Sequence, residues 1–336
     1  AQVAELLGAP VFNQSVPYLT VFPTEHPLFV GELTRDQARV RRLLEPHDLL
    51  LIAGGDGLRM SVPGPVDPLP PGLPIVQIGT RDWEIGKNSH AEIALDADVK
   101  ATLAALVPFL QRKRSKAQAA AADQRAGRVR ADNWAAKRAA RVAKTKPLAT
   151  RKPIMPDYLM LQIADTIPPD AVVVDEGITT TRGLLSFLSI RERQRFYGLA
   201  RGGIGWGVPG AIGVQLALPR RRVLAIIGDG RSRYRIQGLW PAAHLNLPIA
   251  FIIANNGAYS ILKERLVAFG GSSVAKETMI GMDFNPAIRF AGLAESMGLK
   301  ARRVEDPGDI VPALRWALAE PGPTLLDMVV HDGYRN

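Results

Sequence analysis

Cysteine is absent from this sequence of 336 residues, and histidine is rare. Without cysteine the chain can form no disulfide, no thiolate zinc site and no cysteine nucleophile. The five histidines, at positions 26, 47, 90, 244 and 331, are scattered without the spacing of metal ligands. The sequence therefore argues against a function that depends on cysteine or histidine chemistry.

Long apolar segments are absent as well. No stretch of about 18 residues is both apolar and free of charge, and no basic-then-apolar leader opens the chain. We therefore expect a cytoplasmic protein that neither spans a membrane nor carries a secretion signal. The hydrophobic share of 47% is still sufficient for large cores, and the length suits two domains. Because the first residues already follow a helical pattern, we expect the chain to begin within a longer protein.

The net charge of +10 is concentrated in one segment. Residues 111–152 contain 14 Lys or Arg residues against two Asp residues, so the rest of the chain is nearly neutral. This segment is rich in alanine and has few apolar side chains, which is typical of a solvated, partly helical linker. An arm that binds nucleic acid or another anionic surface is the alternative. We favour the linker and expect no nucleic-acid partner.

Predicted helices and short apolar strands alternate on both sides of this linker. In residues 1–110, Thr34 and Gln37 have the spacing of a capping box that opens a helix. Residues 153–336 repeat the alternation more regularly, with a helix expected over residues 284–298. Short buried strands separated by helices are typical of parallel sheets. We therefore predict an α/β protein with two doubly wound parallel-sheet domains joined by the basic linker.

Two polar motifs follow neighbouring predicted strands of the second domain. Gly228-Asp229-Gly230 ends one strand, and after 24 intervening residues Asn255-Asn256-Gly257 ends the next. In a parallel sheet such strand ends meet at one edge, where ligands bind. An aspartate beside an asparagine offers the hard oxygen ligands that Mg²⁺ prefers, and the glycines let backbone amides approach phosphates. The pair predicts a magnesium site that holds a diphosphate.

The segments around these motifs resemble benzoylformate decarboxylase and its acetolactate synthase-like relatives, in the thiamine diphosphate-dependent 2-oxo acid decarboxylase/carboligase family. The resemblance extends over essentially the whole chain and implies a middle domain in residues 1–110 and a phosphate-binding C-terminal domain in residues 153–336. It also implies thiamine diphosphate and Mg²⁺ as cofactors, a small 2-oxo acid as substrate, and a homodimer or homotetramer. The segments that carry it are FPTEHPLFVGEL, GGIGWGVPGAIGVQLALP, IIGDG, LWPAAHLNLPIAFIIANNGAYSIL and GMDFNPAIRFAGLAESMG.

The resemblance further implies roles for individual residues. Asp229 and Asn256 would bind Mg²⁺ through their side chains, and Ala258 would bind it through its carbonyl oxygen. Thr179 would help to hold the diphosphate, the Gly202 carbonyl would meet the aminopyrimidine, and Ile204 would be the wedge that bends the cofactor. The remaining cofactor-binding residues would be Gly230, Ser232 and Tyr259, and the substrate pocket would include Ile261, Leu262 and Arg265. For Tyr259, Ile261 and Leu262, packing at a strand end and helix start is an equally good interpretation.

The resemblance places the glutamate that activates the cofactor on a separate pyrimidine-binding domain, which normally precedes the region seen here. We expect that domain to come from an upstream region or another subunit, and we expect this chain alone to bind cofactor without turnover. Glu176 we interpret as a structural residue that supports the site. The catalytic residues themselves therefore remain unassigned.

Three features depart from the family pattern. Ser61 lies where benzoylformate decarboxylase uses a histidine. Arg231, Arg233 and Arg235 follow the GDG motif where relatives carry mainly small or neutral residues, and an arginine there could either pair with the diphosphate or obstruct the pocket. Ile261 and Arg265 replace smaller or aromatic pocket residues. These differences leave the identity of the 2-oxo acid open.

Other functions compete with this interpretation. Gly205, Gly207 and Gly210, with Asp229 nineteen residues further on, match a dinucleotide-binding fingerprint, although that interpretation leaves the asparagine motif unused. An acetolactate synthase-like carboligase is a second enzyme candidate. A degenerate, non-catalytic cofactor-binding protein is a third possibility, which the three arginines after GDG favour slightly.

Overall fold

The computed structural model describes all residues except 15–17, 20, 21, 56, 59, 61–63, 201, 271–278 and 334–336. The described residues form two compact units that divide inside helix α5 (Trp134–Thr145), after Ala136. Tyr18 and Leu19 belong to the second unit, where Leu19 forms a bridge to Tyr197. The division between the units thus lies within the segment that the sequence predicts to be a linker.

The first unit contains two small sheets, and every strand pair in them is parallel, as predicted. One sheet has two strands and the other has three, in the order β3, β4, β5. The strands are β1 (Val11–Asn13), β2 (Phe29–Glu32), β3 (Leu50–Ala53), β4 (Ile75–Gly79) and β5 (Ile93–Asp96). The helices are α1 (Gln2–Leu7), α2 (Gln37–Leu44), the 3-10 helix η1 (Asp82–Glu84), α3 (Val99–Lys113) and α4 (Lys116–Ala131).

Helix α2 begins differently from the expected capping box. Asp36 is its N-cap, and Asp36 Oδ1 accepts a hydrogen bond from the Arg39 amide at 3.0 Å. The Thr34 hydroxyl instead accepts a hydrogen bond from the Asp36 amide at 2.8 Å, in the turn before the helix. The capping-box prediction is wrong because an aspartate directly before the helix offers its carboxylate to the free amides of the first turn.

Helix α4 forms the first half of the predicted linker, and it packs within the first unit. The side chains of Ala122 and Ala126 are buried, and Arg125 donates two hydrogen bonds to the carbonyl of Leu7, the shorter at 2.7 Å. Gly8 ends α1 with φ of 60°, and a Cβ there would lie 2.0 Å from the Ala122 carbonyl oxygen. Small residues therefore allow α1 and α4 to pack closely, and a helix that packs through alanines shows no stripe of large apolar side chains in its sequence.

In the second unit, basic side chains of α5 form specific contacts. Arg138 donates to the carbonyl of Phe187 at 2.8 Å and to Asp165 at 2.7 Å. Arg141 binds both carboxylate oxygens of Asp157, at 2.9 and 3.0 Å. These contacts account for part of the positive charge without a polyanion.

The second unit is built on one parallel sheet of six strands in the order β10-β11-β9-β8-β6-β7. Its central strands are buried along nearly their whole length, as parallel strands covered on both faces must be. The fold class predicted from the sequence, parallel sheets flanked by helices, is confirmed. The strands are β6 (Val172–Glu176), β7 (Phe196–Gly198), β8 (Val223–Gly228), β9 (Ile249–Asn255), β10 (Lys300–Val304) and β11 (Thr324–Val329).

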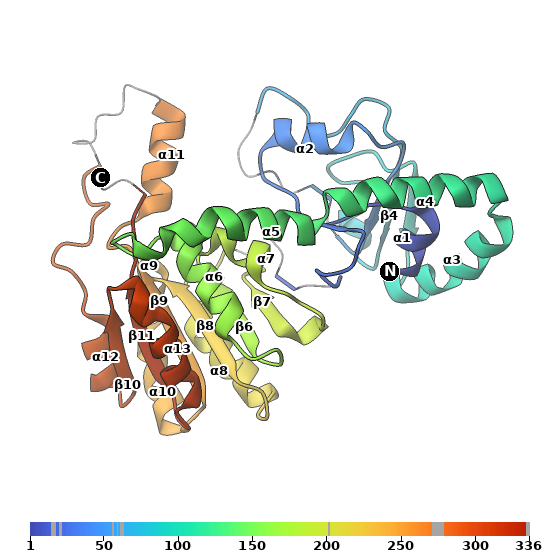
Figure 1. Cartoon of the computed structure of the whole chain (residues 1–336). Helices are drawn as coiled ribbons and strands as arrows, with labels where there is room; N and C mark the ends of the chain where they lie inside the picture. The colour runs from blue at the N-terminus through green and yellow to red at the C-terminus, as the bar shows by residue number, and fades with distance from the viewer. Residues whose placement is uncertain are drawn as a thin grey trace. The chain divides into compact units, whose positions relative to one another are not determined.

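Helices cover both faces of this sheet (Figure 1). One face packs against α6 (Pro156–Thr166), α7 (Leu184–Phe187) and α13 (Ile310–Ala319). The other packs against α8 (Gly207–Ala217), α10 (Leu239–His244) and α12 (Phe290–Ser296). The remaining elements are α9 (Asp229–Ser232), α11 (Ser260–Gly270) and the 3-10 helices η2 (Lys146–Thr150), η3 (Thr180–Gly183), η4 (Arg193–Arg195), η5 (Ile236–Gly238) and η8 (Pro307–Asp309).

Helix α12 is shorter than predicted. It begins at Phe290 instead of Phe284, and Arg289 before it has non-helical backbone angles. Pro286 is part of the reason, because a proline disfavours helical backbone at the residue before it. The segment that the sequence assigned to a helix is thus free to pair with the site, as described below.

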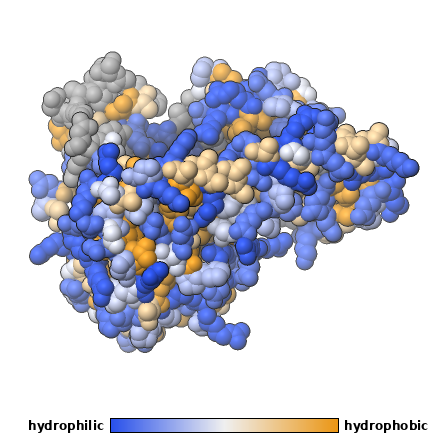
Figure 2. All heavy atoms as spheres, viewed as in Figure 1, coloured by the Kyte–Doolittle hydropathy of each residue, from blue (hydrophilic) through white to orange (hydrophobic). Residues whose placement is uncertain are grey.

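The surface of the protein is mainly hydrophilic on the face shown in Figure 2, and the apolar cores lie beneath it. On the face drawn in Figure 2, hydrophilic residues dominate and hydrophobic ones are scattered among them. Among the described residues, no helix combines the length and the hydrophobicity that crossing a bilayer requires.

Candidate functional site

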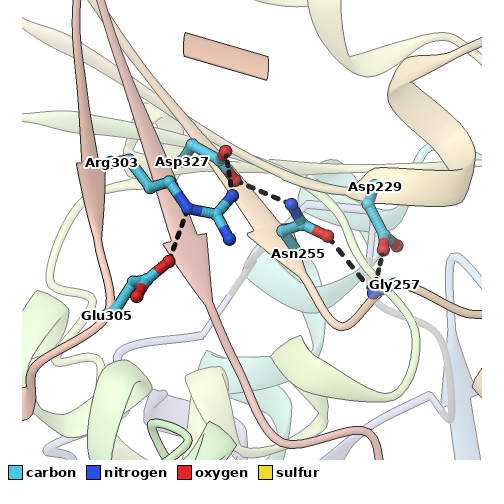
Figure 3. Close-up of polar contacts among 6 residues, drawn as sticks. All are labelled: Asp229, Asn255, Gly257, Arg303, Glu305 and Asp327. Atoms are coloured by element: carbon cyan, nitrogen blue, oxygen red, sulfur yellow. Dashed lines mark hydrogen bonds and ion pairs between the residues drawn. The ribbon is translucent and has the colours of Figure 1, made fainter. Parts of the chain in front are cut away.

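Asp229 lies where β8 ends and the short helix α9 begins. Its side chain is only 3% exposed, and both carboxylate oxygens accept backbone hydrogen bonds of 2.7 Å: Oδ1 from Gly230 and Oδ2 from Gly257 (Figure 3). Burial raises the pKa of Asp229 to about 6, and these amides partly oppose that rise. The structure therefore holds a buried carboxylate in a fixed orientation at the end of the sheet.

Asn256 and Ala258 lie in the turn that follows β9, the strand next to β8. Both are buried, and Asn256 Oδ1 accepts a hydrogen bond from the Ala258 amide at 3.0 Å. Gly257 between them has φ of 68°, a left-handed conformation that glycine adopts without strain. Because the Gly257 amide donates to Asp229, the structure brings the two sequence motifs into direct contact.

The oxygens in this region fit a magnesium ion. One carboxylate, one amide oxygen and one backbone carbonyl are hard ligands, and they leave positions for a diphosphate and water. The hydroxyl of Ser260 is also buried here and has no hydrogen-bond partner among the described residues. In the described part of the chain no group of three or more His, Cys, Asp or Glu side chains could hold a metal ion.

The residues beside Asp229 are closely packed. The Ser232 hydroxyl is buried and donates to the Asp229 carbonyl at 2.8 Å, so it is used inside α9. Tyr259 packs edge-on against Phe284 with ring centroids 4.7 Å apart. A Cβ at Gly230 would lie 3.0 Å from the Tyr259 ring, so this packing leaves no space for a side chain at Gly230.

Glu176, which we expected to be a structural residue, connects the sheet to the glycine-rich loop. Its side chain is fully buried at the end of β6 and accepts hydrogen bonds from the amides of Gly205, at 2.7 Å, and Gly207. Glu176 thereby fixes the glycine-rich loop to the sheet. These contacts argue against a dinucleotide site. The amides of Gly205 and Gly207, two glycines of the fingerprint, already donate to Glu176, and Asp229 accepts a hydrogen bond from Gly257.

Three other predicted residues belong to the loops around Glu176. Thr179 lies just before η3 and is partly buried. Ile204 is 45% exposed, and space around Gly202 is open, with no atom within 4 Å of a Cβ placed there. Gly202 and Ile204 are thus accessible to a ligand, and Thr179 is partly so.

The three arginines after the GDG motif have different surroundings. Arg231 is mostly buried and lies 3.3 Å from Glu176 Oε1. Arg233 stacks over the Phe284 ring at 4.6 Å and donates to the Tyr259 hydroxyl at 3.3 Å. Arg235 donates to the neighbouring Tyr234 carbonyl, at 3.3 Å. Each arginine therefore has a partner within the protein.

The predicted substrate residues lie on α11. Ile261 is partly buried, whereas Leu262 and Arg265 are exposed. Sequence reasoning missed Lys263, which is buried and forms an ion pair of 2.6 Å with Asp283. Ser61, the proposed counterpart of a family histidine, lies outside the described residues.

The Lys263 ion pair accompanies a short stretch of backbone pairing. The Tyr259 amide donates to Met282, the Phe284 amide donates to Gly257, and both bonds are 2.8 Å long. Ala258 and Asp283 accordingly form an antiparallel bridge. Residues 282–284, which end at the first residue of the expected helix, thus stabilise the turn that carries Asn256 and Ala258.

Sequence reasoning also missed a polar network behind the site. Asn255 Nδ2 donates to Asp327 on β11 at 2.8 Å, and Arg303 on β10 donates to the same carboxylate at 2.9 Å (Figure 3). The available signal was Asp327 itself, since a charged residue interrupts the apolar segment TLLDMVV of a buried strand.

Comparison with known proteins identifies the family. The model of the thiamine pyrophosphate enzyme central domain matches residues 1–106, and that of the C-terminal TPP binding domain matches residues 178–328. The chain is 32% identical over 330 residues to benzoylformate decarboxylase from Pseudomonas aeruginosa, covering 97% of this chain and 57% of that protein. It is 27% identical over 339 residues to acetolactate synthase from Mycobacterium bovis, covering 98% and 52% respectively.

A solved structure shares the architecture. The thiamine diphosphate-dependent 4-hydroxybenzoylformate decarboxylase of Rhodococcus jostii RHA1 matches 98% of this chain and 57% of its own, with a TM-score of 0.81 and 29% identity. The chain therefore belongs to the thiamine pyrophosphate enzymes, and it contains their middle and C-terminal domains. It spans about half the length of these relatives.

Proposed function

We propose that this chain is the cofactor-binding part of a thiamine diphosphate- and Mg²⁺-dependent 2-oxo acid decarboxylase similar to benzoylformate decarboxylase. The observation that carries the proposal is the contact between Asp229 and the Asn256 turn at adjacent strand ends, in a chain of this family. We assign residues 1–110 to the middle domain, 111–152 to the linker and 153–336 to the phosphate-binding domain.

In this proposal Asp229 and Asn256 bind Mg²⁺ through their side chains, and Ala258 binds it through its carbonyl. The Asp229 carboxylate supplies the negative charge, and its burial strengthens attraction to a cation. Thr179, Gly230 and the start of α9 face the diphosphate, while Gly202, Ile204 and Tyr259 contact the organic part of the cofactor. When bound, thiamine diphosphate supplies the reactive carbon and the electron sink for loss of carbon dioxide.

The substrate side is formed by residues of α11. Ile261 and Leu262 offer apolar contacts, and the Arg265 guanidinium is suited to a carboxylate. Turnover also needs the pyrimidine-binding domain, which we propose comes from an upstream region or another subunit of a cytoplasmic homodimer or homotetramer.

Calorimetric titration of thiamine diphosphate into the purified chain, with and without Mg²⁺, tests the cofactor assignment. We expect binding that requires Mg²⁺ and is lost in Asp229→Ala. Asp170→Ala, which changes an exposed aspartate of the same unit, is the matched control and retains binding. Equal binding by the Asp229 variant and the unaltered chain would contradict the assignment.

A carboligase is the second candidate, because the acetolactate synthases also align with nearly the whole chain. Product analysis of the complete protein separates the two reactions. A decarboxylase releases an aldehyde from a 2-oxo acid alone, whereas a carboligase joins the two-carbon or larger fragment to a second carbonyl compound.

A further inference from the structure

A chain of hydrogen bonds connects Asp229 to the exposed edge of the sheet (Figure 3). The Gly257 amide is shared between Asp229 Oδ2 at 2.7 Å and Asn255 Oδ1 at 3.2 Å. Asn255 Nδ2 in turn donates to Asp327 Oδ1 at 2.8 Å. The network therefore crosses β8, β9 and β11 before it reaches solvent.

Asp327 determines which way the Asn255 amide faces. An asparagine side chain has a donor end and an acceptor end. Because the donor end binds the Asp327 carboxylate, the acceptor end is left to face the Gly257 amide. A reversed Asn255 would place two donors against each other at Gly257 and would leave Asp327 without this partner.

The charge of Asp327 is compensated from the neighbouring strand. Its side chain is completely buried, and a buried carboxylate is costly unless it is paired and hydrogen-bonded. Arg303, its register partner on β10, donates from Nη1 at 2.9 Å and also binds the exposed Glu305 from Nε at 2.6 Å. Burial raises the pKa of Asp327, and the contacts with Asn255 and Arg303 partly oppose that rise.

Asn255 also helps to position the other proposed ligands, because it is the last residue of β9 and directly precedes them. Asn256 and Ala258 follow it directly, so the bond from Asn255 to β11 fixes the start of their turn. One network thus orients Asp229 through the Gly257 amide and orients the Asn256 turn through its first residue.

We propose that Asn255 and Asp327, supported by Arg303, are positioning residues for the cation site formed by Asp229, Asn256 and Ala258. The inference rests on the proposed function. Residues that orient a metal ligand contribute to affinity without touching the metal, and losing one typically costs about 10- to 100-fold in metal affinity.

Mn²⁺ affinity, measured by electron paramagnetic resonance in saturating thiamine diphosphate, tests the proposal. We expect Asp327→Ala to weaken Mn²⁺ binding by about 10-fold or more. Asp327 also contacts the backbone amide of Phe290 at the start of α12, so Asp327→Asn is the second variant. It keeps the size and one acceptor oxygen, and we expect an intermediate loss, with a similar loss in Arg303→Met.

Lys300→Met is the matched control. Lys300 lies on the same strand as Arg303 and forms an exposed ion pair with Glu320 at 2.7 Å, with no contact to the network. We expect it to keep the Mn²⁺ affinity of the unaltered chain. Amide hydrogen exchange at Gly257 provides a readout that needs no cofactor: it should accelerate in Asp327→Ala and Asp327→Asn but not in Lys300→Met.

The outcomes separate this inference from the proposed function. If Asp229→Ala abolishes Mn²⁺ binding while both Asp327 variants bind normally, with Gly257 exchange unchanged, the positioning inference is overturned and the site assignment stands. If the unaltered chain binds no Mn²⁺ with the cofactor, the proposed function is overturned, and the inference about the cation site falls with it.

Discussion

Both units contain parallel sheets, but their strands differ in how deeply they are buried. In the second unit β8 and β9 are buried along nearly their whole length; Asp229 directly follows β8, and Asn255 at the end of β9 bonds to Asp327 on β11. In the first unit β5 is exposed throughout, with Ile93 51% and Leu95 38% exposed. The strands that carry the Asp229 and Asn256 motifs are thus far more deeply buried than β5 of the first unit.

Buried polar residues differ in a corresponding way. In the first unit Gln77 on β4 connects two loops, donating to the Gly55 carbonyl at 3.3 Å and accepting from the Gly86 amide at 3.0 Å. The first unit also buries the carboxylate of Glu84, in a 3-10 helix and not on a strand. In the second unit the carboxylates of Glu176, Asp229 and Asp327 are buried at or near strand ends of one sheet. Buried charges are expensive, so their concentration at one edge supports a function there.

The largest expected effect comes from the core of the second unit. Phe251 is fully buried in the middle of β9, and Phe251→Ala should cost about 4 kcal/mol of unfolding free energy through the cavity it leaves. Denaturant unfolding of Phe251→Ala and of the unaltered chain measures this loss of unfolding free energy, and cofactor binding is followed in the same samples. A change below about 1 kcal/mol would contradict the deep burial of β9.

A somewhat smaller effect is expected in the first unit. Gly8→Ala should destabilise that unit by about 3 kcal/mol, because φ is positive and the new Cβ would meet the Ala122 backbone. Gly127→Ala on the same helix as Ala122 meets no neighbour and should be neutral or slightly stabilising. If unfolding of the first unit by Gly8→Ala also abolished cofactor binding, the site would depend on both units.

The pH dependence of stability should differ between variants of the two units, because each unit has a carboxyl group whose pKa burial raises to about 7, and the second unit also contains Asp229 with a pKa of about 6. Burial raises the pKa of Glu32 in the first unit and of Asp175 in the second to about 7. Below the pKa of the unfolded chain such a carboxyl group is protonated in both the folded and the unfolded state. As pH rises from there to the folded-state pKa of about 7, the unfolded chain loses its proton first, so the stability of the folded state falls. Between pH 5 and pH 8 each should remove about 2.5 kcal/mol of stability.

Matched amide variants assign these contributions. Asp175→Asn should flatten the pH profile of the second unit, and Glu32→Gln should flatten that of the first, both measured by thermal unfolding from pH 5 to 8. Asp170→Asn, at an exposed position near Asp175, should leave both profiles as they are. A profile that stays equally steep in Asp175→Asn would show that another group is responsible.

The smallest effect is expected from exposed ion pairs. Lys152→Met removes the contact with Asp306, and because both side chains are largely exposed and screened by solvent it should leave stability nearly unchanged. Thermal unfolding of Lys152→Met and the unaltered chain, at low and at high salt, measures the difference. A clear drop in melting temperature that disappears at high salt would show that this ion pair contributes more than its exposure indicates.

The sequence was sufficient for the fold class and for the expectation that the motifs of Asp229 and Asn256 meet at adjacent strand ends, because apolar strands followed by polar turns are local signals. It could not reveal Asn255, Asp327 and Arg303, since their contacts depend on the register of three strands that are distant in the chain. Thr34 failed as a cap because Asp36 stood closer to the helix. The alanines of α4 were overlooked since small side chains give no apolar stripe.

We propose above that Asp229, Asn256 and Ala258 form one cation site. Anomalous diffraction from crystals grown with Mn²⁺ and thiamine diphosphate tests it most directly, because Mn²⁺ accepts the same oxygen ligands as Mg²⁺. The account predicts one strong anomalous peak within coordination distance of Asp229, Asn256 and the Ala258 carbonyl. A peak bound elsewhere, or clear cofactor density at this edge with no cation beside Asp229, would contradict it.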